Sequence, residues 1–293
     1  MQRITSWSLR VVMALFVILS MPVQAGKPIR FAPLPMASLE QMTREYLPFL
    51  DYLEKQSGQT FELAYHASYE DLLTALASGQ VDLAYLGPLP YVVLTEQTDS
   101  IVPIVQLLDS EGAAEYTCAI VHFADHSPNL EHTGRPHRVA LTQPLSTCGY
   151  LSVEHYLNAQ GQSLEDQGYA YHYVGSHENV AMGVILDEFD LGGMKTQIAQ
   201  RYHHLGLRIV AETDPMPGFV LVANRMTLQP ELIDFVRDAL LRLEPLTREQ
   251  DREAVQGWSN NLRYGARPVD EQTYEKVRER WRQLKIDWKG AEQ

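Results

Sequence analysis

Two adjacent hydroxyl side chains, Ser146 and Thr147, stand in the segment PLSTCGYLSVEHYL, where a predicted strand ends and a predicted helix begins. The first backbone N–H groups of a helix have no partner within it and point outward with the positive end of its dipole. Neighbouring hydroxyls add donors, so the segment is typical of a site for phosphate, phosphonate or sulfate-like oxygens. An ordinary helix cap is the alternative, because serine and threonine are common capping residues.

A histidine occupies a comparable position in the segment GSHENVAMGVILDEF. Ser176 is the predicted cap of this helix, and His177 follows it near the positive end of the dipole. An imidazole placed there can donate a hydrogen bond to an oxyanion, and the dipole should lower its pKa. The alternative is a solvent-facing histidine without a role.

Lys195 follows the glycine pair in GGMKTQIAQRY, between a predicted strand and a predicted helix. Ligands of open α/β sheets usually bind at such strand ends. An ammonium there would complement an anion even in an acidic protein, because salt screens the more distant charges. The alternative is a surface lysine that pairs with Asp187 or Glu188.

The chain of 293 residues carries a formal net charge of -13. This balance argues against binding to nucleic acid or anionic lipid, since both require a basic face. The sequence also contains no G-x-S-x-G, H-E-x-x-H or G-x-x-x-x-G-K motif, the patterns that carry common hydrolytic and nucleotide chemistry. We therefore expect a binding protein rather than an enzyme, and no cofactor.

The first 25 residues have the three parts of a cleaved secretory signal. Two arginines come first, an apolar run follows, and small residues lead up to Ala25. The apolar run is much shorter than the roughly 20 residues that a membrane-spanning helix needs. No cysteine follows it directly, so lipid attachment is not expected. We predict an exported, soluble protein of the periplasm.

Cys118 and Cys148 are the two cysteines of the chain, and both lie in the exported part. A single pair in an oxidising compartment favours a disulfide, which would make the turn at Cys148 more rigid. Two unpaired thiols are the alternative.

The segment HFADHSPNLEHTGRPH is rich in side chains that can bind zinc or copper. Its candidate ligands are His122, His126, His132 and His137, with Asp125 and Glu131. The prolines and the irregular spacing favour a polar connecting loop. We therefore predict no metal site and keep a metal-handling protein as an alternative.

Strands alternate with helices in two series, which predicts an α/β protein. The first series has strands at 29–35, 60–66, 81–88 and 101–107, with helices at 38–57 and 68–79 and a third helix before the last of these strands. The second has strands at 116–123, 138–143, 169–175 and 190–194, with helices at 146–157, 176–189 and 195–202. A strand at 219–224 and helices at 230–243, 247–258 and 270–284 complete the chain.

Irregular stretches at 109–116 and 211–218 separate the two series. They predict a first lobe from residues 26–112, a second lobe from 113–212, and a return of 213–293 to the first lobe. Two connections between lobes make a hinge, and a hinge allows the lobes to close on a small ligand.

The chain resembles the periplasmic phosphate-, phosphite- and phosphonate-binding proteins of ABC transporters. The resemblance runs in order from about residue 29 to 285, through LEQMTREYLPFLDYLEKQSG, YEDLLTALASGQVDLAYLGPLPYVV, STCGY, GSHENVAMGVILDEFDLGG and YGARPVDEQTYEKVRERW. It implies the type II periplasmic binding protein fold, with two lobes, a hinge and a cleft between the lobes.

The resemblance also implies a set of ligand-binding residues. On the second lobe these are Ser146, Thr147, the N–H groups near Cys148 and Gly149, and His177. On the first lobe they are Tyr85, Gly87 and Tyr91 in YLGPLPY, with Met36 after the first strand.

Three positions depart from the family pattern. Cys148 stands where serine is common, and Met36 stands where an aromatic residue is common. Phe219 replaces an acidic residue in the late PMPGF turn. A carboxylate at that position would suit an aminoalkyl tail, so its loss argues against an aminophosphonate ligand.

These features together predict a monomeric solute-binding protein that captures a small oxyanion for an ABC permease and its ATPase. The second hypothesis keeps the fold and changes the role, to a sensing module that docks on a membrane histidine kinase or cyclase.

Overall fold

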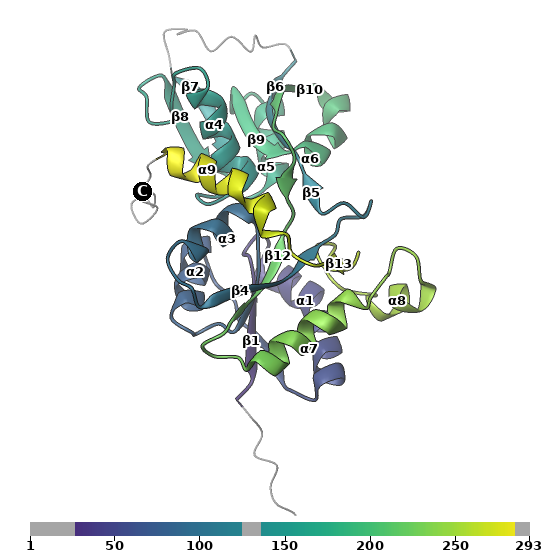
Figure 1. Ribbon diagram of the computed structural model, residues 1–293. Coiled ribbons are helices and arrows are strands. Elements are labelled where there is room, and N and C mark those ends of the chain that lie inside the picture. The colour runs from purple at the N-terminus through teal and green to yellow at the C-terminus, as the bar shows by residue number, and fades with distance from the viewer. Residues whose placement is uncertain (1–26, 125–135, 285–293) are drawn as a thin grey trace, which may run out of the picture.

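The computed structural model describes residues 27–124 and 136–284 of the chain. Within these ranges the protein has two α/β lobes that meet at a hinge (Figure 1). One lobe is built on a six-stranded sheet and the other on a five-stranded sheet. We refer to them as lobe 1 and lobe 2.

The sheet of lobe 1 has the strand order β13-β4-β12-β3-β1-β2. Its strands are β1 (Ile29–Pro33), β2 (Phe61–Leu63), β3 (Leu83–Leu86), β4 (Ile101–Leu107), β12 (Val220–Asn224) and β13 (Ala266–Arg267). Strand β1 runs parallel to β2 and β3, whereas β12 runs antiparallel to β3 and β4. The expected parallel sheet is therefore mixed, because β12 enters from the hinge in the opposite direction.

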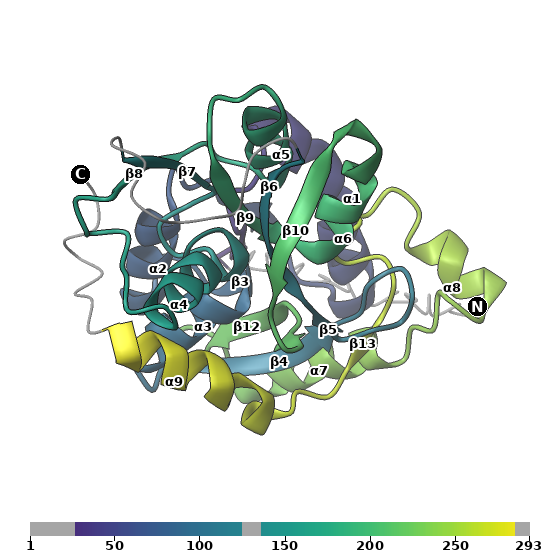
Figure 2. The ribbon, with the colours of Figure 1, turned by 90° about the horizontal axis from the view of Figure 1, so that it is seen from above.

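Helices cover both faces of this sheet, with α2 and α3 on one side and α1 and α7 on the other (Figures 1 and 2). The helices of this lobe are α1 (Leu39–Ser57), α2 (Tyr69–Ala77), α3 (Pro88–Thr95), α7 (Pro230–Leu241) and α8 (Glu249–Ala254). A 3-10 turn (Glu271–Tyr274) leads into α9 (Glu275–Leu284), which packs against α3 and also against lobe 2.

Helix α1 begins and ends at the residues expected from the sequence. The Ser38 hydroxyl accepts a hydrogen bond from the Gln41 amide at 3.3 Å, and Gly58 adopts the left-handed conformation that ends the helix. The apolar face between these caps is buried in the core, and Pro48 lies inside the helix. Sequence therefore determines the limits of this element locally, through its caps.

We expect Ser38→Ala to lower the free energy of unfolding by about 1 kcal/mol, the usual cost of losing an N-cap hydroxyl. Chemical denaturation would measure this change. Thr43→Ala is a suitable control, because the Thr43 hydroxyl bonds only to a carbonyl of its own helix, that of Leu39. Equal effects of the two substitutions would contradict a special role for the cap.

The sheet of lobe 2 has the strand order β10-β6-β9-β7-β8. Its strands are β6 (Cys118–Phe123), β7 (His137–Leu141), β8 (Tyr169–Tyr173), β9 (Leu191–Lys195) and β10 (Leu207–Glu212). Its helices are α4 (Ser152–Asn158), α5 (His177–Ile185) and α6 (Thr196–Arg201), with a 3-10 turn at His203–Leu205. Strand β10 lies at residues for which the sequence predicted no strand.

The helix expected at 146–157 opens with a π-helical turn, Thr147–Leu151, before α4 begins. The Leu151 amide donates to the Ser146 carbonyl five residues earlier, and the Ser152 hydroxyl donates to the Thr147 carbonyl. Such wide turns often occur at functional sites. Here the turn lies at the end of β7 that faces lobe 1.

Both lobes position their first strand with the same pair of residue types. Arg30 in β1 forms an ion pair with Asp82 at 3.0 Å, and Arg138 in β7 forms one with Asp190 at 2.9 Å. In each case the aspartate stands directly before a neighbouring parallel strand, and it also accepts the backbone N–H of the arginine. The two pairs fix the register of the strands whose carboxyl ends carry the site.

The hinge consists of two short antiparallel strands, β5 (Glu115–Tyr116) and β11 (Met216–Pro217). They occupy the two stretches that the sequence marked as irregular. The lobes also touch directly, since the Leu89 amide of lobe 1 donates to the Thr147 hydroxyl of lobe 2 at 3.0 Å. The two lobes are therefore in direct contact in this structure, as in a closed conformation.

Candidate functional site

A pocket of about 110 Å³ lies between the two lobes, and we call it the interlobe pocket. Lobe 1 and the hinge line it with Leu34, Met36, Tyr69, Gly87, Pro90, Tyr116 and Phe219. Lobe 2 lines it with Thr142, Leu145, Ser146, Thr147, Cys148, Gly175, Ser176, His177, Glu178 and Lys195. The parallel strands β7 and β9 of lobe 2 end at this pocket, as expected for a ligand site in an α/β sheet.

The π-helical turn presents its first amide groups at this pocket. The Ser146 hydroxyl accepts from the Gly149 amide at 2.9 Å, so the serine caps the turn from inside. The amides of Thr147 and Cys148 come before the first bonds of the turn, where N–H groups have no partner within a helix. They are the natural donors for an oxyanion in the pocket.

Thr147 connects three parts of the molecule. Its hydroxyl accepts from the Leu89 amide of lobe 1, and it lines the interlobe pocket together with Tyr116 of the hinge. Burial raises the pKa of Tyr116, and the Thr147 hydroxyl opposes that rise. A ligand that contacts this turn would therefore affect the contact between the two lobes beside the hinge.

His177 lines the pocket at the start of α5, as its position after the Ser176 cap predicted. Its Nδ1 atom is buried and, within the part of the chain that the structure describes, has no hydrogen-bond partner. Burial, with the nearby Lys195 charge, lowers the pKa of His177 to about 3. The imidazole is thus neutral, and one of its ring atoms is available to a ligand.

We expect His177→Ala to weaken ligand binding by about 1 kcal/mol, the value of a hydrogen bond between a protein and its ligand. Calorimetry at pH 7 with the parent protein as reference would measure it. His204→Ala is the matched control, because His204 is exposed and does not line the interlobe pocket. An unchanged affinity for His177→Ala would remove this residue from the site.

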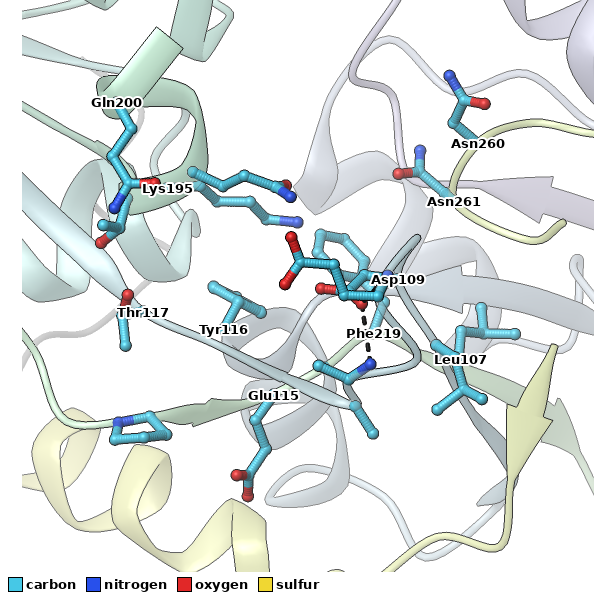
Figure 3. Close-up of a pocket in the computed structure, with 18 of the residues that line it drawn as sticks. Leu107, Asp109, Glu115, Tyr116, Thr117, Lys195, Gln200, Phe219, Asn260 and Asn261 are labelled. Atoms are coloured by element: carbon cyan, nitrogen blue, oxygen red, sulfur yellow. Dashed lines mark hydrogen bonds between the residues drawn. The ribbon is translucent and has the colours of Figure 1, made fainter. Parts of the chain in front are cut away.

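Lys195 lies at the end of β9, where its side chain reaches the boundary between lobe 2 and the hinge. Its ammonium lies 4.5 Å from the centre of the Tyr116 ring and 4.4 Å from that of Phe219 (Figure 3). Among the described residues no carboxylate lies within 4 Å of it, so the alternative of a pair with Asp187 or Glu188 does not hold. Burial lowers the pKa of Lys195 to about 8, and Asp109 partly opposes this shift.

The lysine is therefore a cation held by ring faces rather than by a carboxylate. Such contacts stabilise an ammonium only modestly. A bound oxyanion would supply the missing negative charge, and the gain would be large because the site is partly desolvated.

A disulfide joins Cys118 at the start of β6 to Cys148 in the π-helical turn. It links the first strand after the hinge to the turn that carries the amide donors. A cross-link of this kind also restricts the unfolded chain. Cys148 consequently lines the pocket and holds the turn in place through its disulfide.

Two of the predicted ligand-binding residues, Gly149 of lobe 2 and Tyr91 of lobe 1, lie outside the lining of the interlobe pocket. Gly149 does not line the interlobe pocket, and its amide is bonded to Ser146. A Cβ atom at Gly149 would lie 1.9 Å from the Thr142 hydroxyl, so glycine is needed there for close packing. Tyr91 points into lobe 1, where its hydroxyl donates to Glu271 at 2.5 Å. Neither residue lines the interlobe pocket, so their predicted ligand contacts stay predictions.

The remaining first-lobe residues surround the pocket in different ways. Met36 and Gly87 line it, as predicted. Tyr85 stacks on Phe219 with ring centres 4.8 Å apart and lines a neighbouring cavity instead. The apolar ring of Phe219 faces the Lys195 ammonium.

The comparison with known families decides what kind of protein carries this pocket. Residues 31–274 match the family described as "ABC transporter, phosphonate, periplasmic substrate-binding protein". The chain belongs to this family. It is therefore a solute-binding component of an ABC importer, and family membership places it with periplasmic binding proteins.

Individual relatives of this binding protein are distant in sequence. It is 23% identical over 271 residues to the phosphate-import protein PhnD of Mycolicibacterium smegmatis. The alignment covers 85% of this chain and 84% of that protein. The fold resembles PhnD1 of Prochlorococcus marinus, solved with methylphosphonate, with a TM-score of 0.71 and 18% identity over 88% of this chain and 98% of that chain. It also resembles a phosphonate-transporter binding protein of Pseudomonas aeruginosa, with a TM-score of 0.69, 18% identity, and 90% and 88% of the two chains covered. At these identities the structural likeness shows the shared fold, the type II arrangement of two lobes.

Several pocket residues of the binding protein were not singled out by sequence reasoning. Thr142 stands directly after β7, and its buried hydroxyl has no hydrogen-bond partner among the described residues. Its position at the end of a predicted strand could have marked it as a pocket residue, because ligands of α/β sheets bind at strand ends. Tyr69 and Tyr116 also line the pocket, but their place depends on packing between segments far apart in the chain.

The histidine-rich segment of the binding protein is only partly within the described ranges. His126, His132, Asp125 and Glu131 lie outside them, whereas His122 and His137 lie on β6 and β7. Among the described residues no group of three or more possible ligands could hold a metal ion. No helix in the same ranges is long and apolar enough to cross a membrane.

Proposed function

We propose that this binding protein captures a small phosphorus oxyanion, a phosphonate or phosphate, in the interlobe pocket. The observation that carries the proposal is the convergence of donors there. The Thr147 and Cys148 amides, the unpartnered Nδ1 edge of His177 and the Lys195 ammonium all belong to residues that line one small pocket. An anion of tetrahedral shape can accept from several directions at once.

Relatives support this choice of ligand. The related protein of Mycolicibacterium smegmatis imports phosphate, and the related protein of Prochlorococcus marinus was solved with methylphosphonate. The apolar side of the pocket, with Met36, Pro90 and Leu145, suits a carbon substituent better than a fourth charged oxygen. We therefore favour an alkyl- or organophosphonate over free phosphate.

The transport role follows from closure of the lobes on this ligand. The ligand would be held by amides of lobe 2 while Thr147 contacts lobe 1 and the hinge, so the closed form is favoured when the pocket is occupied. A permease with its ATPase would recognise that form. We place lobe 1 at residues 26–112 and 213–293, lobe 2 at 113–212, and a signal that is removed after Ala25 before them.

Isothermal titration calorimetry with phosphate, phosphite, methylphosphonate, sulfate and methanesulfonate tests the proposal. We expect binding of the phosphorus oxyanions and little or no binding of methanesulfonate, which carries only one negative charge. Sulfate is a dianion with no proton to donate to Glu178 of the pocket lining, and we expect it to bind less tightly than phosphate. Failure of every phosphorus oxyanion to bind would contradict the proposed function.

A further inference from the structure

A second and larger cavity, of about 410 Å³, borders the interlobe pocket, and Figure 3 shows the residues that line it. We call it the hinge chamber. Segments from both lobes and the hinge line it, among them residues 107–117 and 212–219, the start of α6, and Asn260 and Asn261 of lobe 1. A cavity that both lobes build is sensitive to their closure, as the interlobe pocket is.

The two cavities share three residues, Tyr116, Lys195 and Phe219. These residues form the boundary between the cavities, with the lysine ammonium against the two rings. A ligand whose charged head contacts Lys195 in the interlobe pocket can therefore keep its first carbon against the apolar side of that pocket and extend a longer arm past the boundary into the hinge chamber. The chamber provides the room that a longer substituent needs.

The polar lining of the chamber consists largely of side-chain amides, together with a buried threonine hydroxyl. Four side-chain amides line it, two on α6 and two on lobe 1: Gln197, Gln200, Asn260 and Asn261. An amide both donates and accepts hydrogen bonds. Thr196, also in this wall, is 4% exposed, and its hydroxyl has no hydrogen-bond partner among the described residues. A buried polar group of this kind normally has a partner, and a ligand or water can supply it.

Carboxylates supply the rest of the polar wall: Asp109, Glu111, Glu115 and Glu212. Lys195 is the one basic side chain among the residues that line the chamber. The chamber therefore repels a second anionic group and keeps the charged head of a ligand on the interlobe side. Carboxylates accept hydrogen bonds from hydroxyls, and the ring faces of Tyr85, Tyr116 and Phe219 can pack against carbon. A protonated amine would be attracted by these carboxylates and repelled by Lys195 at the boundary, so an amine-bearing arm is the competing candidate that the test below includes.

We propose that the hinge chamber binds a hydroxylated carbon arm of the ligand, so that the protein takes a polyol-substituted phosphonate. This inference rests on the proposed function, because it assigns the phosphonate head to the interlobe pocket. The amides and carboxylates recognise the hydroxyls of the arm, the rings contact its carbons, and Lys195 stands between head and arm.

Matched ligands on the intact mature protein test the inference. Calorimetry would compare methylphosphonate, propylphosphonate, 2,3-dihydroxypropylphosphonate and 3-aminopropylphosphonate. We expect the dihydroxypropyl compound to bind about tenfold more tightly than the propyl compound, the gain of one or two net hydrogen bonds. Gln200→Leu and Asn260→Leu should each remove much of that gain and leave methylphosphonate unchanged. Gln256→Leu, an exposed amide that does not line the chamber, should change neither.

The possible outcomes distinguish failure of the hydroxylated-arm inference from failure of the proposed oxyanion-binding function. If methylphosphonate binds but the dihydroxypropyl and propyl compounds bind equally, the inference is overturned and the proposed function stands. Tighter binding of the aminopropyl compound than of the dihydroxypropyl compound would overturn the choice of a hydroxylated arm. If no phosphonate and no phosphate binds, the proposed function fails and the inference fails with it.

Discussion

Lys195→Met should weaken oxyanion binding by about 3 kcal/mol, in the range found when one partner of a desolvated charge pair is removed. Methionine keeps the length of the side chain and its packing between the Tyr116 and Phe219 rings, so the change removes mainly the charge. Calorimetry with methylphosphonate or phosphate would measure the loss.

Arg201→Met is the matched control for this substitution. Arg201 lies at the end of α6, the helix that begins directly after Lys195, and its side chain is 62% exposed in a pair with Glu178, so its removal should change affinity little. Equal small effects at both positions would show that Lys195 does not contact the ligand.

The affinity should also fall above about pH 8, because burial lowers the pKa of Lys195 to about 8 in the unliganded protein. A bound anion raises that pKa, so binding takes up a proton at higher pH and becomes weaker as the proton is lost. Lys195→Met provides the reference, since any titration of the ligand itself affects both proteins. Parallel pH profiles of the two proteins would contradict the assignment.

The same lysine has the opposite effect on the unliganded protein. Its pKa is lower in the folded state than the usual value near 10.4 in an unfolded chain. The unfolded state therefore binds more protons between these two values, and this group makes the folded state more stable as the pH rises through them. Affinity and unliganded stability should thus change in opposite directions over that range.

Thr147→Val should weaken ligand binding by about 1–3 kcal/mol, the cost of a lost hydrogen bond to a charged group or of an unpaired buried donor. Valine has nearly the same shape, so the change isolates the hydroxyl. The Leu89 amide would lose its acceptor, which now lies 3.0 Å away. We therefore expect a second effect, a more open average form in small-angle scattering without ligand.

Thr43→Val serves as the control for Thr147, because the Thr43 hydroxyl bonds only to a carbonyl of its own exposed helix turn. Its affinity and its scattering profile should match those of the parent. An unchanged affinity in Thr147→Val would exclude this hydroxyl from the site. An unchanged scattering profile would show that the bond to Leu89 does not hold the lobes together.

Local signals were enough to predict several of the residues that line the interlobe pocket. The strand-to-helix turn at Ser146 and Thr147, the capped histidine at 177 and the lysine at the end of β9 are each encoded in a few neighbouring residues. Caps and strand ends place such groups at one edge of a sheet, whichever partner they later meet. The alternation of strands and helices likewise predicted the α/β lobes.

What the sequence left open depends on contacts between distant segments. The hinge chamber exists because residues near 110, 197 and 260 meet in space, and no short motif encodes that meeting. Tyr91 was assigned to the pocket from its motif, but its ring packs on Tyr274 and its hydroxyl bonds to Glu271, both near the end of the chain. Strand β10 was missed because its pairing with β6 at the sheet edge is what makes it a strand.

A crystal structure of the mature protein with methylphosphonate is the most direct test of the whole account. We predict that the phosphonate oxygens lie within hydrogen-bond distance of the Thr147 and Cys148 amides and of the Lys195 ammonium, with His177 at the same group. A phosphonate bound elsewhere on the protein, without contact to any of these four groups, would contradict the account.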